Sequence, residues 1–231
     1  MKKKKKLLWG FCLIVLTALL AVVAFYGRNK VLLNNLEEEV KILAKLDVGS
    51  DRYNRGLKTS GDYALVEKTI KEYMDEYAVL LQDTLKIKQD EKFTKILSYS
   101  NYEKDGPNFE ESLNYLALEK TNFNDNIAKL LDMSKEEAII KYGEDRITDE
   151  YYLSLYKELI LSDDLKNNFW STSADLVTTR DDVNRLFDQS TEALNLLVAN
   201  QKYWKLEDGE IKIMSQTLYD QYMAIINGLN K

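Results

Sequence analysis

The chain has 231 residues, of which 45% are hydrophobic and 30% are charged, a balance typical of a folded globular protein and not of a disordered one. It contains no histidine, which excludes every mechanism that needs a histidine base or a histidine metal ligand. The single cysteine, Cys12, excludes intrachain disulfides and thiolate zinc sites. Carboxylates are therefore the main side chains left for catalytic chemistry.

The N-terminal residues predict a membrane anchor. Residues 1–6 are a basic tail with five lysines, and residues 7–26 contain no charged side chain. As a helix, the second segment spans about 30 Å, the thickness of the hydrocarbon core of a bilayer. Trp9 and Tyr26 lie near its two ends, where aromatic residues anchor membrane helices. We expect a single pass through the cell membrane, with the lysines in the cytoplasm and the C-terminal part outside.

Three other interpretations of the N-terminal segment stay open. A signal peptidase would cleave after Ala24, although the apolar segment is longer than that of a removed signal. Cys12 would be the acylated residue of a lipoprotein, although bulky aromatic residues precede it. Residues 10–16, after the basic leader, resemble the processing site of type IV prepilins, but Val15 stands where that family has a glutamate. The simplest interpretation of Cys12 is a small apolar residue inside a membrane helix.

The charge of the chain is divided between its two parts. Residues 1–26 carry five lysines and no acid, which leaves 27 basic residues against 38 acidic ones in the rest, a net charge of −11. An acidic domain of this kind argues against binding to nucleic acid or to anionic lipid headgroups. The absence of any cysteine after position 12 fits a domain that is stable without disulfides.

The expected fold class is mainly α. Residues 27–47 carry apolar side chains at 3-4-3 spacing and predict an amphipathic stalk helix or a short coiled coil that continues the membrane helix. Residues 48–231 predict an extracytoplasmic helical bundle, with a loop first and then helices over about 62–88 and after the breaker at 104–107. Capping residues predict further helix starts at 134–137, 148–150, 162–164, 179–182 and Ser215.

One short segment predicts strands. Residues 203–213 alternate apolar and charged side chains around Asp208-Gly209, which favours a two-residue hairpin turn. That turn pairs Leu206 with Ile211 and Trp204 with Ile213, so all four apolar side chains share one face. Like charges oppose each other on the outer face, so the hairpin needs the protein core beneath it.

No arrangement of residues predicts catalysis. The adjacent acids Asp163-Asp164, Asp181-Asp182 and Glu136-Glu137 point about 100° apart on a helix, so the members of a pair do not converge on one ligand. All three pairs lie close to a predicted helix start, where acids stabilise the helix dipole. We therefore expect no catalytic residue, no metal and no cofactor. An enzyme that uses carboxylates alone stays a minor alternative, and it would need two acids from different helices facing each other across a cleft.

The tyrosines give the only candidates for a binding surface. Most of the fifteen tyrosines fall near apolar helix faces, where they are expected to pack against neighbouring helices. Tyr53, in the loop after the predicted stalk, and Tyr99 and Tyr102, before the Gly106-Pro107 breaker, are the predicted partner surface.

Taken with the anchor, these observations favour a non-enzymatic single-pass membrane protein. Its extracytoplasmic domain would bind a protein partner or be a subunit of a cell-envelope assembly. The alternative is a ligand-sensing or solute-binding domain that acts through a separate transducer. A deep pocket would favour the alternative, and a packed core with an exposed apolar patch would favour the first interpretation.

Overall fold

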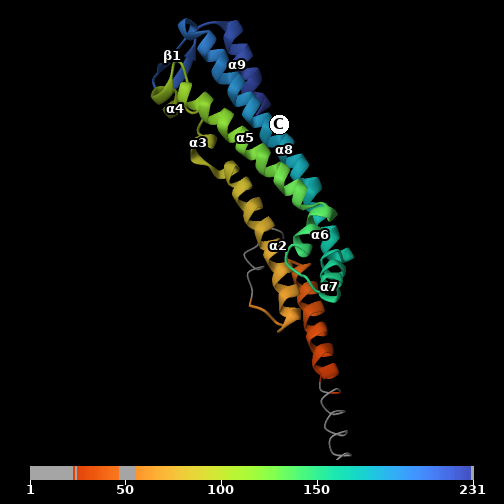
Figure 1. Ribbon diagram of the computed structural model, residues 1–231. Helices are drawn as coiled ribbons and strands as arrows, with labels where there is room; N and C mark the ends of the chain where they lie inside the picture. The colour runs from red at the N-terminus through yellow and green to blue at the C-terminus, as the bar shows by residue number, and fades with distance from the viewer. Residues whose placement is uncertain (1–22, 24, 47–55, 230–231) are drawn as a thin grey trace, which may run out of the picture. The chain divides into compact units, whose positions relative to one another are not determined.

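The computed structural model describes residues 23, 25–46 and 56–229, and this part of the chain is mainly helical with one small antiparallel hairpin (Figure 1). The first helix covers residues 25–43. The elements after it are α2 (Asp62–Leu85), η1 (Lys86–Gln89), α3 (Glu91–Thr94), α4 (Tyr99–Asp105), α5 (Glu110–Met133), α6 (Glu136–Glu144), α7 (Glu150–Ile160), α8 (Asp163–Ala199), η2 (Gln201–Tyr203), β1 (Trp204–Glu207), β2 (Glu210–Ile213) and α9 (Gln216–Gly228). The predicted combination of helices with one hairpin is confirmed.

Most of the predicted membrane span lies outside the described residues. Residues 1–6 and all of 7–26 except Val23, Phe25 and Tyr26 lie outside the described residues. Within the described ranges, no helix combines the length and the apolar composition that a membrane crossing requires. The span over 7–26 therefore stays a prediction.

The chain forms two compact units, each assembled from two stretches of sequence. The first unit consists of Met1–Asp75 and Ile139–Asn168, and the second of Glu76–Ala138 and Phe169–Lys231. The helix predicted as a stalk over 27–47 thus belongs to a unit that also contains a segment from the middle of the chain.

In the first unit, the helix over 25–43 is exposed at its start and packed at its end. The predicted apolar seam consists of Leu33, Leu36, Val40 and Leu43; the first is half-buried, and the other three are at most 4% exposed. Burial of side chains at this spacing is what fixes an amphipathic helix against its neighbours. The end of the predicted stalk is therefore part of a packed core.

The turn between α6 and α7 in the first unit depends on one glycine. The Tyr156 side chain is fully buried, and its hydroxyl donates to the carbonyl oxygen of Ile139 at 2.9 Å. Its ring lies against Gly143, where a Cβ would be 2.2 Å from the nearest ring carbon. The Asp149 carboxylate caps α7 by accepting from the backbone amides of Tyr151 and Tyr152, as the predicted helix start requires.

In the second unit, α5 and the C-terminal part of α8 lie side by side and antiparallel (Figure 1). Lys120 forms an ion pair with Asp188, and one turn further along α5 the Asn124 side chain donates to the Asn184 amide oxygen at 2.8 Å. Residue numbers therefore rise on α5 as they fall on α8. Buried aromatic and aliphatic side chains fill the space between the elements of this unit, among them Phe93, Phe109, Leu116, Phe123, Ile127, Phe187, Leu194 and Leu197.

The helix start predicted at 179–182 is wrong. Helix α8 is continuous from Asp163 to Ala199. The acids at this point form ion pairs and do not cap a helix: Asp181 lies 2.9 Å from Arg180, and Asp182 lies 3.2 Å from Arg185. The segment contains no glycine or proline, so nothing in the backbone stops the helix there.

The predicted hairpin is confirmed in its register and its turn. Trp204 pairs with Ile213 and Leu206 with Ile211, and Asp208 and Gly209 have φ values of 55° and 82°. Positive φ at both turn residues is the geometry that Asp-Gly favours.

The tryptophan of the hairpin packs it against the helical core of the second unit. The Trp204 side chain is 7% exposed and its ring stacks on Phe109 with centroids 5.9 Å apart. Its indole N–H donates to the carbonyl oxygen of Leu197 at 2.8 Å. Strand β2 also contacts α9, so the hairpin rests on the core as its charge pattern requires.

Candidate functional site

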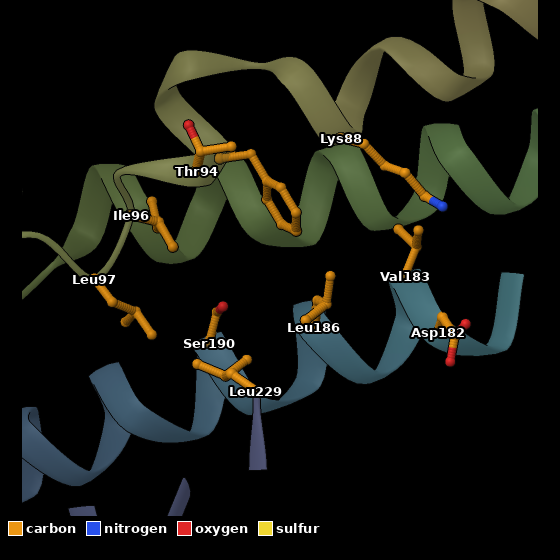
Figure 2. Close-up of a pocket in the computed structure, with 10 residues that line it drawn as sticks. Lys88, Thr94, Ile96, Leu97, Asp182, Val183, Leu186, Ser190 and Leu229 are labelled. Atoms are coloured by element: carbon orange, nitrogen blue, oxygen red, sulfur yellow. The ribbon is translucent and has the colours of Figure 1, made fainter. Parts of the chain in front are cut away.

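The best candidate for a functional site is an apolar cavity in the second unit. Its volume is about 500 Å³, within the range of roughly 300–1,000 Å³ that is usual for ligand pockets. Elements η1 and α3 with the turn after them form one wall, and α8 forms the other (Figure 2). The apolar side chains that line the cavity are Phe93, Ile96, Leu97, Val183, Leu186 and Leu229.

A polar break at residues 88–91 follows α2, and the short helix α3, which forms this wall, begins there. The Asp90 carboxylate caps α3 by accepting from the Phe93 amide at 2.9 Å. Phe93 in α3 and Ile96 in the turn after it are both buried, at 8% and 3% exposed. The Phe93 ring packs on Phe187 with centroids 4.8 Å apart, which fixes this wall against α8.

One buried hydroxyl interrupts the apolar wall of α8. Ser190 is 4% exposed, and it forms no hydrogen bond with any residue in the described part of the chain. Its hydroxyl points into the cavity (Figure 2). The Ser190 oxygen is accessible from the cavity, so a polar atom of a bound molecule can form a hydrogen bond with it.

The charges of the cavity are at one end. Lys88 and Asp182 lie together there, whereas Leu97 and Ser190 lie toward the other end (Figure 2). Asp182 is paired with the Arg185 guanidinium at 3.2 Å. The Lys88 ammonium has no hydrogen-bond or ion-pair partner among the residues that the structure describes. This end of the cavity therefore carries an unbalanced positive charge.

A second hollow in the same unit is small and polar. Its volume is about 150 Å³, and acidic and amide side chains make up much of its lining. Asp90 at its edge accepts from the Tyr115 hydroxyl at 2.7 Å. That hydrogen bond, together with the one from the Phe93 amide, lowers the pKa of Asp90. Each of these contacts stabilises the cap of α3, so we assign the hollow a structural role.

A buried cluster of charges lies in the first unit. The Lys71 ammonium is 2.9 Å from a Glu39 carboxylate oxygen and 2.7 Å from Glu67, and all three residues are at most 5% exposed. Glu67 also accepts from the backbone amides of Lys58 and Thr59 and from the Thr59 hydroxyl. Burial alone would raise the pKa of Glu67, but the hydrogen bond from the Lys71 ammonium, together with those from Thr59 and Lys58, outweighs it and lowers the pKa. The cluster fastens the loop before α2 to that helix.

The acidic pairs do not form a site. Glu136-Glu137 and Asp163-Asp164 lie in the first turns of α6 and α8, as predicted. Among the described residues, no three acids or thiols come together in a way that would hold a metal ion.

The predicted anchor and surface residues differ in whether the structure describes them and in how exposed they are. Trp9 and Tyr53 lie outside the described residues. Tyr26 is 71% exposed at the start of the helix over 25–43, and Tyr99 is half-buried at the start of α4.

Tyr102 corrects the predicted partner surface. It is 2% exposed, and its hydroxyl lies 2.7 Å from the Tyr222 hydroxyl of α9. Its ring packs on Phe109 with centroids 5.3 Å apart. The residue belongs to the core because α4 turns this side chain inward against α5 and α9.

The residues that line the cavity were not predicted as a site. The sequence shows Phe93, Ile96 and Leu97 as an apolar group after the polar break, which is one wall. Nothing local connects that group with Ser190, which lies more than ninety positions later and forms the facing wall.

No protein-family model matches this chain, and no curated protein or solved structure matches it either. Its function is therefore inferred from its own residues and geometry.

Proposed function

We propose that the chain is a non-enzymatic single-pass membrane protein whose extracytoplasmic helical domain binds a protein partner or is a subunit of a cell-envelope assembly. The observation that carries this proposal is the change in burial along the helix over 25–43. Val23, Phe25 and Tyr26 are 67%, 63% and 71% exposed, and they directly continue the charge-free residues 7–22. Exposed apolar side chains at that point are explained by a bilayer around them.

Exposed side chains at the two ends of the hairpin and at the start of α9 support the partner surface. Tyr203, Met214 and Tyr219, which we call the hairpin-base group, are 47%, 61% and 47% exposed. The Met214 amide donates to the Tyr203 carbonyl oxygen at 2.8 Å, so the first two are neighbours across the hairpin. Tyrosine and methionine are enriched in protein interfaces, where they supply apolar contact area.

Topology is tested by cysteine labelling of the full-length protein in spheroplasts. In a Cys12→Ser background, Lys68→Cys places a thiol on the exposed face of α2, and Lys4→Cys places one in the basic tail. A membrane-impermeant maleimide should label the first variant in intact spheroplasts and the second only after permeabilisation. The reverse pattern would contradict the proposed orientation.

The partner surface is tested by photo-cross-linking in intact cells. A photoreactive amino acid at Met214 should give a discrete cross-linked species, which Tyr203→Asp should abolish. The matched control is the same amino acid at Leu118, which is 59% exposed on α5 but distant from the hairpin in sequence. Equal cross-linking at both positions would show nonspecific contact and contradict the surface.

A second candidate function is binding of a small ligand. The cavity of about 500 Å³ in the second unit supports it, because it has the size and the mainly apolar lining of a ligand pocket.

A further inference from the structure

We propose that the cavity of the second unit binds the acyl chain of an amphiphile that carries one anionic group, with that group at Lys88. The proposal deepens the second candidate function and does not depend on the membrane topology. Three features of the cavity carry it: its long apolar interior, its unbalanced charge at one end, and the unpartnered hydroxyl of Ser190 on its wall.

The interior is shaped for a chain. Its residues on α8 run from Asp182 to Ser190, which separates the two ends by about 12 Å at 1.5 Å per residue. Between these ends Val183 and Leu186 line the wall of α8 (Figure 2), and Phe93 and Ile96 line the facing wall. An extended hydrocarbon chain would remove these side chains from water along its whole length.

The charged end selects the sign of the headgroup. Asp182 is already neutralised by Arg185, whereas Lys88 has no partner among the described residues. A carboxylate or phosphate at this point would form a charge-assisted hydrogen bond with the Lys88 ammonium. A cationic headgroup would meet an unbalanced positive charge instead.

The Ser190 hydroxyl favours a ligand with a polar atom on its chain. Ser190 is 4% exposed, points into the cavity and has no hydrogen bond in the described part of the chain. A ligand oxygen well along the chain from the anionic group, such as a chain hydroxyl, would satisfy it. An acid hydroxylated on its chain is therefore expected to bind more tightly than a simple acid of equal length.

The test uses the full-length protein in phosphatidylcholine nanodiscs. One arm adds dodecanoate with a photoactivatable diazirine on its chain, and the other incorporates phosphatidylglycerol with the diazirine on one acyl chain. Mass spectrometry should place adducts within residues 88–97 or 182–190. Adducts from the first arm identify a free acid as the source, and adducts from the second identify a membrane lipid; either result supports the proposal.

Competition and variants test the chemistry. Unlabelled dodecanoate should suppress the adducts, and dodecylamine should not. Lys88→Glu should lower the adduct yield about five- to tenfold, the order expected from losing one charge-assisted hydrogen bond at an exposed site. The matched control is Lys86→Glu, which makes the same charge change on η1 but outside the cavity, and it should leave the yield unchanged.

A filling variant tests the cavity itself. Leu186 is half-buried on the wall of α8, and Leu186→Trp should fill the space and abolish the adducts while the helical circular dichroism spectrum is kept. Adducts that persist in Leu186→Trp, or that dodecylamine suppresses as well as dodecanoate does, would overturn the proposal. The absence of adducts from both probes would also overturn the proposal. The cavity would then be a candidate site for an apolar helix of a protein partner.

Discussion

The hydroxyl groups of Tyr102 and Tyr222 lie 2.7 Å apart in the core of the second unit, and both residues are at most 7% exposed. They join α4 to α9, which are 120 positions apart at these residues. Burial, followed by the neighbouring Tyr222, raises the pKa of Tyr102 well above its ordinary value, so the pair stays neutral over the physiological range. Each hydroxyl satisfies the other, which explains how two tyrosines are accommodated in an apolar core.

This pair predicts a clear non-additivity. Tyr102→Phe or Tyr222→Phe alone leaves one buried hydroxyl without this partner and should cost about 1–3 kcal/mol of the free energy of unfolding. The double variant removes both hydroxyls and should cost less than the sum of the two single changes. Urea unfolding of the full-length protein in nanodiscs measures all four proteins. Strict additivity would show that the two hydroxyls do not interact.

The second prediction concerns the glycine beneath Tyr156. Gly143→Ala places a Cβ 2.2 Å from a fully buried ring, and overpacking of this kind should cost about 1–3 kcal/mol. Gly27→Ala is the matched control, because it also lies in a helix but has no atom within 4 Å of the added Cβ. Alanine is the better helix former by up to about 1 kcal/mol, so the control should be neutral or stabilising. Thermal unfolding that moves in the same direction for both variants would contradict the close contact.

Local features of the sequence predicted the hairpin and most helix ends, and they failed where contacts between distant segments decide. Asp208-Gly209 specifies its own turn, and Ser215 caps α9 by accepting from the Leu218 amide. At 179–182, by contrast, the acids had local ion-pair partners within α8, so a cap pattern was present without a helix start. A capping pattern therefore predicts a helix start only where the preceding helix also ends.

The candidate site was beyond local prediction for the same reason. Tyr102 is accommodated in the core through its contact with Tyr222, and the cavity forms where α3 faces α8. Lys88 belongs to a polar break that the sequence shows plainly, but its lack of a partner is visible only once its neighbours are placed.

The third prediction is a pH dependence in the first unit. The pKa of Glu67 is lowered in the folded protein by its hydrogen bonds, so the folded state binds a proton less readily than the unfolded chain. The stabilisation is present above the ordinary glutamate pKa and is lost as the pH falls through the lowered value. Glu67→Gln should therefore lose less stability than the wild type between pH 7 and pH 3, when unfolding is measured by urea titration at each pH.

The control for this pH dependence lies on the same helix. Glu72 is an exposed member of a surface pair with Lys68 at 3.5 Å, and Glu72→Gln should leave the pH profile of the wild type unchanged. A wild-type profile that is matched by Glu67→Gln would show that the Glu67 carboxylate does not contribute to acid sensitivity.

The last prediction separates a structural tryptophan from a binding one. Trp204 is 7% exposed, stacks on Phe109 and donates its indole N–H to Leu197, so Trp204→Ala should cost about 3–5 kcal/mol of the free energy of unfolding. Its neighbour Tyr203 is 47% exposed, and Tyr203→Ala should change stability by no more than about 0.5 kcal/mol. Tyr203→Ala should nevertheless lower cross-linking from Met214, because it removes part of the proposed surface from an intact fold. Unchanged thermal stability in Trp204→Ala would show that the indole does not hold the hairpin on the core.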